Sequence, residues 1–484
     1  MKNKLVITLL FWVLGCSLRA ETNPVTISKP LVSKSKSNSF HLFGDDILCI
    51  DYKYEQTVYN DDGKITSQQP FELTLYDSAF NVRKSVKFAK INRWNYRVEV
   101  SKDGKNIFIF YQPWRWNRSV ANGTVKLFCL DRNLTCTRIC KFIIPGSRPY
   151  ITEIERVAGN HIVVSGEFAN RENRFMLNVD LATGRYVKFK LKKNEEYYVT
   201  KHFPQDNKTL VISHPYTTRS DSFMLNMFTT TGVLLKRQWI TLSEGYLIQS
   251  INLVRSGKNK YIVYGQGSND KREAGHRAYV FAILYENGKL KKTTIVNESM
   301  IDARARDDFD KVGLIPADEP QRDRFKKNRK DMRTGSDYIH FTDTEMHLDG
   351  NLYLFAGLYG RELEGGVLVE LDNELKLLNS YVFPIIDKLT LLNRKYYNCD
   401  NGKSTVNSGG FYYAYGLGKN ISGIHISKAG VVSGFAFDNN DSNNICISGA
   451  TQKGFIAQSQ TYNSSAPEGE KYTQHVWKVN VNNK

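Results

Sequence analysis

Short apolar runs recur along the chain, separated by polar segments that contain glycine. Between Asp349 and Phe383 a turn, an apolar strand, a polar loop, a second strand, a tight turn and a third strand follow one another. Eight such runs occur, most of them roughly forty to sixty residues apart, which predicts repeated β-units. The eight runs are 47–52, 107–111, 162–165, 210–213, 261–264, 352–355, 411–414 and 455–457.

Each run is followed by a polar loop, a second strand and usually a third. Hairpin turns are predicted at Thr183-Gly184, Thr231-Gly232, Asn287-Gly288 and Ala429-Gly430, because glycine tolerates the positive φ of such turns. A weaker strand precedes most units, for example at 96–100, so each unit holds four antiparallel strands. Eight units of four strands predict an all-β fold, a single β-propeller of about eight four-stranded blades, or seven blades if one unit is irregular.

The last unit lacks a fourth strand, because the sequence stops shortly after Val481. Residues 23–33 have no place in any other unit and can supply the missing strand. Closure by this N-terminal strand removes the free sheet edges that otherwise invite aggregation. The predicted propeller domain spans residues 21–484.

Two segments carry a family resemblance. Residues 100–110 resemble the hairpin of TolB-type propeller repeats, and the units ending at 175–184 and 367–372 resemble the propeller repeats of exported bacterial proteins. The resemblance extends as a pattern over residues 40–484. It implies the fold and points to no specific family.

The N-terminus is typical of an export signal over residues 1–20. Lys2 and Lys4 precede the apolar run 5–15, which is too short to span a bilayer as a resident helix. Cleavage after Ala20 gives a secreted or periplasmic protein. Residues 13–16 also match a lipobox, and lipidation of Cys16 would make the chain an outer-membrane lipoprotein.

Six further cysteines remain, an even number that permits disulfides in an oxidising compartment with fifteen connectivities. Cys136 and Cys140 have a spacing that zinc tolerates. No second Cys or His pair lies near them, and alternation on a strand places both sulfurs on one face, so we expect no metal and no cofactor. The six are Cys49, Cys129, Cys136, Cys140, Cys399 and Cys446.

The chain is basic. Loss of Lys2, Lys4 and Arg19 with the signal leaves 64 of the 67 basic side chains against 49 acidic ones, a formal charge of +15. This charge favours polyanions, membrane surfaces or acidic glycans, or it is a dispersed surface charge that keeps the protein soluble. Residues 297–338 form a charged insertion, acidic and then basic. It is either solvated with its charges paired, or a lid or docking arm.

Aromatic and guanidinium groups concentrate in the loops predicted for one face, where the second-to-third strand loops and the inter-blade connectors emerge. Aromatic rings stack on sugars and Arg holds carboxylate or sulfate in bidentate fashion, although both residue types also serve ordinary blade packing. We predict an exported, non-catalytic protein that binds glycans or other anionic ligands there. The main candidates are Trp114, Arg115, Trp116, Arg148, Tyr150, Arg277, Tyr359 and Arg361, with Tyr462 as a further loop aromatic.

Two other functions stay open. A polysaccharide lyase acting on uronate polymers needs a base and a charge clamp, and His214, Tyr216 and Arg219 lie on one predicted rim, with His202 on the preceding inner strand. A lone histidine is more often a structural residue. The chain can alternatively be a protein-docking scaffold. It lacks hydrolase, metalloprotease, P-loop and dinucleotide motifs and any nucleic-acid module, and we expect membrane contact only through a lipid on Cys16.

Overall fold

The structure is a computed structural model, and its described residues cover all the repeated units. They are 25–33, 38–43, 46–52, 56–59, 65–68, 71–88, 96–101, 106–111, 123–144, 149–168, 174–190, 195–215, 221–242, 246–269, 277–297, 340–359, 363–384, 402–417, 420–438, 445–451, 453–467 and 471–481.

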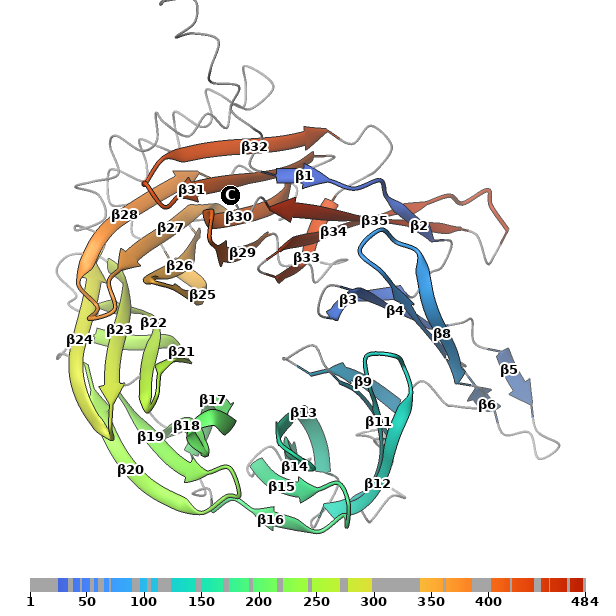
Figure 1. Ribbon diagram of the computed structural model, residues 1–484, viewed down its shortest axis with the longest axis horizontal. Coiled ribbons are helices and arrows are strands. Elements are labelled where there is room, and N and C mark those ends of the chain that lie inside the picture. Colours follow the sequence, from blue (N-terminus) through green and yellow to red (C-terminus); the bar gives the residue numbers. More distant parts are fainter. Residues whose placement is uncertain are drawn as a thin grey trace, which may run out of the picture.

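Eight antiparallel sheets of four strands stand around a ring, which confirms the predicted eight-bladed propeller (Figure 1). The strands of the first four blades are as follows. Blade 1 holds β3 (Asn38–Phe43), β4 (Asp46–Tyr52), β7 (Phe71–Tyr76) and β8 (Val82–Phe88). Blade 2 holds β9 (Tyr96–Val100), β10 (Ile107–Tyr111), β11 (Gly123–Leu130) and β12 (Cys136–Ile144). Blade 3 holds β13 (Pro149–Ala158), β14 (His161–Phe168), β15 (Arg174–Asp180) and β16 (Tyr186–Lys188). Blade 4 holds β17 (Glu195–Phe203), β18 (Lys208–Pro215), β19 (Ser222–Thr229) and β20 (Leu234–Thr241).

The other four blades follow the same order. Blade 5 holds β21 (Tyr246–Gly257), β22 (Lys260–Asn269), β23 (Arg277–Glu286) and β24 (Lys289–Asn297). Blade 6 holds β25 (His340–Asp349), β26 (Asn351–Tyr359), β27 (Leu363–Leu371) and β28 (Leu377–Pro384). Blade 7 holds β29 (Gly402–Asn407), β30 (Gly410–Leu417), β31 (Asn420–Ser427) and β32 (Val432–Asp438). Blade 8 holds β33 (Ile445–Thr451), β34 (Gly454–Tyr462) and β35 (Tyr472–Val481).

Two small elements are added to this plan. The hairpin β5 (Gln56–Tyr59) and β6 (Ile65–Gln68) is inserted between β4 and β7, and a short 3-10 turn (Pro204–Asp206) joins β17 to β18. The described residues include no helix long and apolar enough to cross a bilayer.

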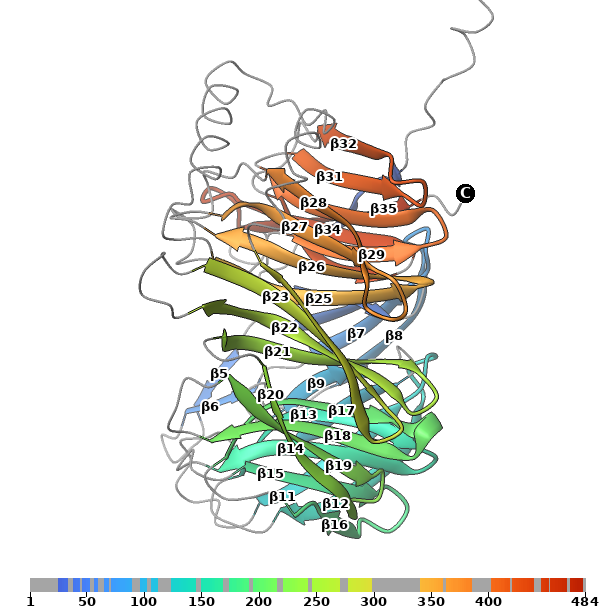
Figure 2. The same cartoon turned by 90° about the vertical axis from the view of Figure 1, so that its left-hand side faces the viewer.

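The first strand of each blade lies nearest the ring axis and the fourth lies on the outside (Figures 1 and 2). First strands of neighbouring blades approach one another, as β17 and β21, β25 and β29, and β33 and β3 do. Adjacent sheets pack face to face, so the ring is a stack of sheets rather than one continuous barrel wall.

The N-terminal strand closes the ring. β1 (Val25–Ile27) pairs antiparallel with β35, with Val25 opposite Val481, and becomes the fourth strand of blade 8. β2 (Leu31–Ser33) continues along the same partner, with Leu31 opposite Val476. Val25 is 1% exposed and packs among Trp477, Val479 and residues of blade 7. Closure by residues near the N-terminus is therefore confirmed.

A separate apolar cluster fills each of the eight junctions between blades. In β10, Ile107 and Ile109 pack towards blade 1, whereas Phe108 and Phe110 pack towards blade 3. Alternate side chains of a strand point to opposite faces, so a strand buried on both faces must be apolar at every position. This is why the second strands read as unbroken apolar runs.

A five-residue turn recurs between the third and fourth strands. In blade 2, the Asp131 carboxylate accepts the backbone N–H groups of Asn133 and Thr135 at 2.8 and 2.9 Å, and Leu134 takes a left-handed φ of 53°. Asp77 and Asp372 form the same arrangement, with Phe80 and Leu375 at φ 65° and 58°. Leu134 and Leu375 are buried in blade junctions, and this burial offsets the strain of positive φ in residues other than glycine.

The predicted glycine turns are confirmed, since Gly184, Gly232, Gly288 and Gly430 all have positive φ. The five cysteines in the described part of the chain, Cys49, Cys129, Cys136, Cys140 and Cys446, form no disulfide; Cys399 lies outside it. Cys136 is exposed and Cys140 is buried.

Closure by β1 generates a stability prediction. Val25→Ala should lower the free energy of unfolding by about 2 kcal/mol, because a buried side chain at the ring joint loses its packing. Thr26→Ala, at the exposed neighbouring position, should change it by less than about 0.5 kcal/mol. Denaturant unfolding of both variants tests this, and equal effects would mean that β1 does not carry closure.

Candidate functional site

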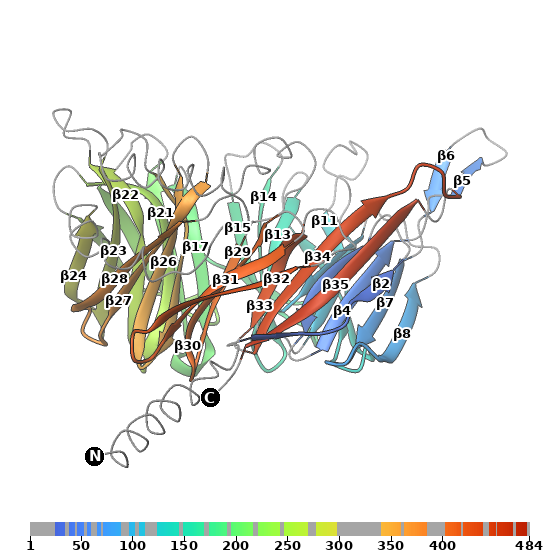
Figure 3. The same cartoon turned by 90° about the horizontal axis from the view of Figure 1, so that it is seen from above.

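The strand order sorts the connections onto two faces. First strands run from one face to the other, second strands return, and third and fourth strands repeat the path. One face therefore collects the ends of second and fourth strands and the starts of first and third strands, and we call it the loop face. The other face holds the short hairpin turns and is called the turn face (Figure 3).

Of the eight main binding candidates and the rim residues His214, Tyr216 and Arg219, four lie in the described strands, and all four lie at the loop-face ends. Tyr150 begins β13, His214 is near the end of β18, Arg277 begins β23 and Tyr359 ends β26. They belong to blades 3, 4, 5 and 6 and thus lie along one arc of the ring. Trp114, Arg115, Trp116, Arg148, Tyr216, Arg219 and Arg361 lie outside the described residues, as does most of the insertion, 298–338.

The two histidines considered for a lyase lie at opposite ends of blade 4. His214 pairs with Glu196 at the loop-face end and is 7% exposed. His202 pairs with Thr209 near the turn face, where its Nδ1 lies 2.8 Å from the Thr209 hydroxyl. Five residues of β18, from Thr209 to His214, separate the two levels, which is about 17 Å. His202 is on the inner strand as expected, but it cannot join His214 at the rim.

Aromatic rings at the loop face fall into two kinds. Tyr279 is fully buried, donates to the Leu247 carbonyl at 3.1 Å and meets Tyr246 edge-on at 4.8 Å between centroids. These rings pack blade 5. Tyr462 ends β34 with 57% exposure, and its ring lies 4.9 Å from that of Tyr472, which begins β35. A supported and exposed ring of this kind is suited to stacking on a ligand.

Inner strands are bulged close to the loop face in five blades. The register of pairing shifts between Ile151 and Glu153 and between Ile248 and Ser250, and similarly in β17, β25 and β33. Two bulged positions, Thr152 and Gln249, are exposed. Bulges often aim side chains at functional sites. The alternation of apolar and polar residues along one strand does not predict a bulge, because a bulge is defined by the pairing with the partner strand.

A second polar group lies between the inner strands of blades 6 and 7. The Ser404 hydroxyl donates to the Glu345 carboxylate at 2.5 Å, and the His347 Nε2 is 2.8 Å from the same hydroxyl and 3.6 Å from the carboxylate. Burial raises the pKa of Glu345, and the hydrogen bonds from His347 and Ser404 outweigh it, so the net pKa is lowered.

This Ser-His-Glu group is not arranged as a nucleophilic triad. A triad needs the acid on the imidazole nitrogen that does not face the serine, whereas here the hydroxyl and the carboxylate both approach Nε2. Ser404 is also buried. The group therefore links two blades and does not prepare a nucleophile.

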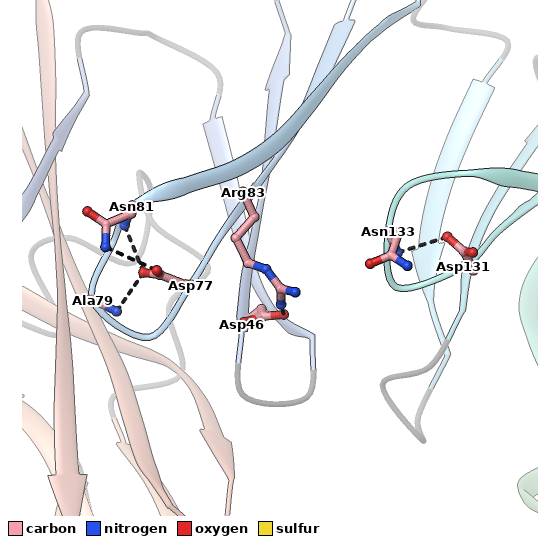
Figure 4. Close-up of polar contacts among 7 residues, drawn as sticks. All are labelled: Asp46, Asp77, Ala79, Asn81, Arg83, Asp131 and Asn133. Carbon is pink, nitrogen blue, oxygen red and sulfur yellow. Dashed lines mark hydrogen bonds and ion pairs between the residues drawn. The ribbon is translucent and has the colours of Figure 1, made fainter.

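Acidic groups on the turn face are engaged in holding the fold. The Arg83 guanidinium pairs with the Asp46 carboxylate at 2.6 Å. Figure 4 shows this pair together with the Asp77 and Asp131 turns. Hydrogen bonds from the Asn81 side chain and backbone lower the pKa of Asp77. Among the described residues, no group of three or more His, Cys, Asp or Glu is placed to hold a metal ion.

Asp206 connects blades 4 and 5 at this face. Its buried carboxylate accepts hydrogen bonds from Arg255 Nε and Nη2 at 2.9 and 3.1 Å, from the Tyr261 hydroxyl at 2.7 Å and from the Asn259 N–H at 3.3 Å. The Arg255 bonds lower the pKa of Asp206 most, burial opposes them, and the Tyr261 and Asn259 bonds add to the lowering, to about 2.

No protein-family model matches the chain, and no curated relative matches it. Solved structures do. A protein assigned as a 6-phosphogluconolactonase from Bacteroides fragilis is 12% identical, with 83% of this chain and 95% of that chain covered and a TM-score of 0.38. The polysaccharide lyase Uly1 is 9% identical, with coverage of 92% and 90% and a TM-score of 0.39. Likeness at this level carries no inference about activity.

The Asp206 network generates a pH prediction. Asp206→Asn should lower the free energy of unfolding by about 1–3 kcal/mol at neutral pH, because charge-assisted hydrogen bonds are lost. The folded-state pKa is depressed to about 2, so the wild-type advantage is present above the unfolded pKa of about 4 and is lost as the pH falls towards 2.

Denaturant unfolding at several pH values measures this difference. Glu374→Gln is the control, since Glu374 is 66% exposed in its pair with Lys260 and its removal should cost less than about 0.5 kcal/mol. A difference between Asp206→Asn and wild type that stays constant from neutral pH to pH 2 would contradict the ionic role of Asp206.

Proposed function

We propose that the protein is an exported binding protein that engages glycans or other anionic polymers through its loop face without transforming them. The observation that carries the proposal is the Tyr462–Tyr472 pair, an exposed ring backed by a second ring at the loop-face end of blade 8. The apolar C–H faces of a sugar stack on such a ring with little loss of side-chain freedom.

Charge supports an anionic ligand. The chain has a formal charge of +18, or +15 without the predicted signal segment, and a field of that sign concentrates polyanions near the surface. Arg277 begins β23 at the loop face, and Arg148 and Arg361 remain candidates from the sequence. Guanidinium groups hold carboxylate or sulfate in two parallel hydrogen bonds.

The loop face has the extent that a polymer needs. It collects strand ends from all eight blades, and the candidates within the described residues, Tyr150, Arg277, Tyr359 and Tyr462, belong to blades 3, 5, 6 and 8. A chain of sugars can contact several blades at once, so weak contacts with single rings add up by effective concentration. Export places the protein where such polymers occur, with or without a lipid on Cys16.

The test measures binding of the chain from Glu21 onward to uronate-containing and sulfated polysaccharides by gel retardation. Tyr462→Ala should weaken binding about tenfold, as should Trp114→Ala combined with Trp116→Ala, because a central stacking ring is worth about 1.4 kcal/mol. Trp239→Ala, a half-exposed ring on the outer strand β20, is the control and should bind as wild type.

The other functions give different results in the same experiment. A rise in ultraviolet absorbance from unsaturated product, abolished in His214→Ala, would make the protein a polysaccharide lyase. Full retention of affinity in both aromatic variants would show that the loop face is not the site. No binding to any polysaccharide would leave the protein-docking scaffold as the better hypothesis.

A further inference from the structure

The outer strands of blades 1 to 5 carry basic side chains and no acidic one within their described bounds. Most of the basic side chains are exposed. Those on the strands and the residues flanking β16 are Arg83, Lys84, Lys87, Arg138, Lys141, Arg185, Lys188, Lys190, Lys236, Arg237, Lys289, Lys291 and Lys292. These outer strands therefore carry an excess of positive charge, although Arg83 pairs with Asp46 and Lys289 lies opposite Glu286.

Apolar side chains are exposed among these charges. Blades 3 and 4 carry Val187 at 52%, Leu235 at 52% and Trp239 at 50% exposure. Tyr186 and Leu234 on the same two strands are also exposed. By pairing and alternation, Val187 lies on the side of blade 3 that faces blade 4, and Leu234, Leu235 and Trp239 lie on the facing side of blade 4. Tyr186 pairs with Val179 and lies on the other side of blade 3, towards blade 2. We call the first four residues the patch, since single exposed apolar residues are normal on a protein surface but a group of four is not.

The patch exists because blade 3 is short at its outer edge. β16 has three residues, whereas β20 of the next blade has eight. Val187 pairs with Asn178, whose side chain reaches Thr230 of blade 4, so Val187 lies on the side of blade 3 that faces blade 4. Trp239 lies on the side of blade 4 that faces blade 3, since it alternates with Arg237, which bonds Asn226 there. The apolar core of the junction between blades 3 and 4 holds five buried residues. It does not include Val187 or Trp239, which lie further out on the outer strands.

Acidic groups border this surface and keep their charge when only neutral groups bond them, but the basic side chains of the outer strands outnumber them. Asp180 is held in its turn by the Ala182 N–H at 2.8 Å and the Thr183 hydroxyl at 2.8 Å. Asp206 is paired with Arg255. Lys188, Lys190, Lys289, Lys291 and Lys292 form no ion pair within the described part of the chain. Their charges are available to a partner.

We propose that the outer strands of blades 3 and 4, flanked by the basic strands of blades 2 and 5, form a docking surface for an anionic lipid membrane. Exposed aliphatic and aromatic side chains enter the boundary between headgroups and acyl chains, while surrounding Lys and Arg meet the lipid phosphates. Trp and Tyr are favoured at that boundary, and long basic side chains extend their charges to the headgroups.

Two other occupants fit less well. A second copy of the chain would bring together two edges that both carry excess positive charge, and like charges in contact are unfavourable. A soluble polyanion would pair with the Lys and Arg groups, but it would leave the four exposed apolar side chains of the patch without a partner. The membrane surface uses both features. It lies on the circumference and not on the loop face, so the proposal does not rest on glycan binding.

The experiment is co-sedimentation of the chain from Glu21 onward, which cannot carry a lipid on Cys16. The probes are vesicles of phosphatidylcholine alone and of phosphatidylcholine with phosphatidylglycerol. Binding should require phosphatidylglycerol and weaken as salt rises. Equal binding to both vesicle types, or none to either, would overturn the proposal.

Variants separate the two components of the surface. Lys188→Glu combined with Lys190→Glu should weaken vesicle binding by at least roughly twentyfold, since each basic residue near an anionic surface is worth about fivefold. Leu235→Ser combined with Trp239→Ser should weaken it by about tenfold, because two half-exposed apolar groups no longer insert.

Controls keep the result specific to this surface. Lys376→Glu and Tyr462→Ser alter an exposed charge in blade 6 and an exposed ring on the loop face, and they should bind vesicles as wild type. Thermal unfolding confirms that each variant is folded. If vesicle binding depends on the lysines but not on Leu235 and Trp239, and soluble dextran sulfate binds with the same dependence, the surface is a polyanion site and the lipid proposal is wrong.

Discussion

Every blade of this protein is apolar on both faces, and that property decides the architecture. A four-stranded sheet that must bury two faces needs a neighbour on each side, and a finite row of such sheets always leaves two faces open. Only a closed ring removes them. The eight apolar clusters, one at each junction, are the result. Closure rests on a short element, because β1 completes the sheet of blade 8 and buries Val25 against blade 7 and its own sheet.

The ring also divides the surface by physical role. Hairpin turns at the turn face are fixed by their own side chains, as Asp131 and Asp372 show, and cross-blade groups such as Asp206 with Arg255 hold neighbouring sheets together there. The loop face has an exposed aromatic pair and bulged inner strands. An outer strand buries at most one of its two faces in a junction between blades. Its other face is exposed to solvent and can carry charged side chains. This freedom explains why so many Lys and Arg residues lie on the circumference.

The two proposed surfaces are geometrically compatible. The loop face is perpendicular to the ring axis, and β16 and β20, which carry the patch, lie on the circumference (Figures 1 and 3). A protein lying with this edge on a membrane would have its axis parallel to the bilayer. Its loop face would then be perpendicular to the membrane surface and accessible to polymers close to the membrane. Binding of a lipid surface and binding of a glycan therefore need not compete.

Much of the fold follows from local sequence. Runs such as Ile107 to Phe110 are apolar at every position, which indicates strands buried on both faces, and glycine at 184, 232 and 430 marks turns that require positive φ. The count of units and the missing fourth strand of the last one led to the closing role of the N-terminal segment. These features depend on neighbours in the chain, so a single sequence records them.

Tertiary structure decided what depends on partners distant in the chain. Phe80, Leu134 and Leu375 take positive φ in turns closed by a local Asp, and only the fold shows that their side chains then pack in blade junctions. The bulges at Thr152 and Gln249 exist only in relation to the paired strand. The pairing of β17 with β18 places His202 and His214 at opposite ends of blade 4. The patch at Val187 and Trp239 is exposed because β16 is shorter than β20. The sequence by itself determined which residues form strands and turns, and packing between blades determined which of their side chains meet.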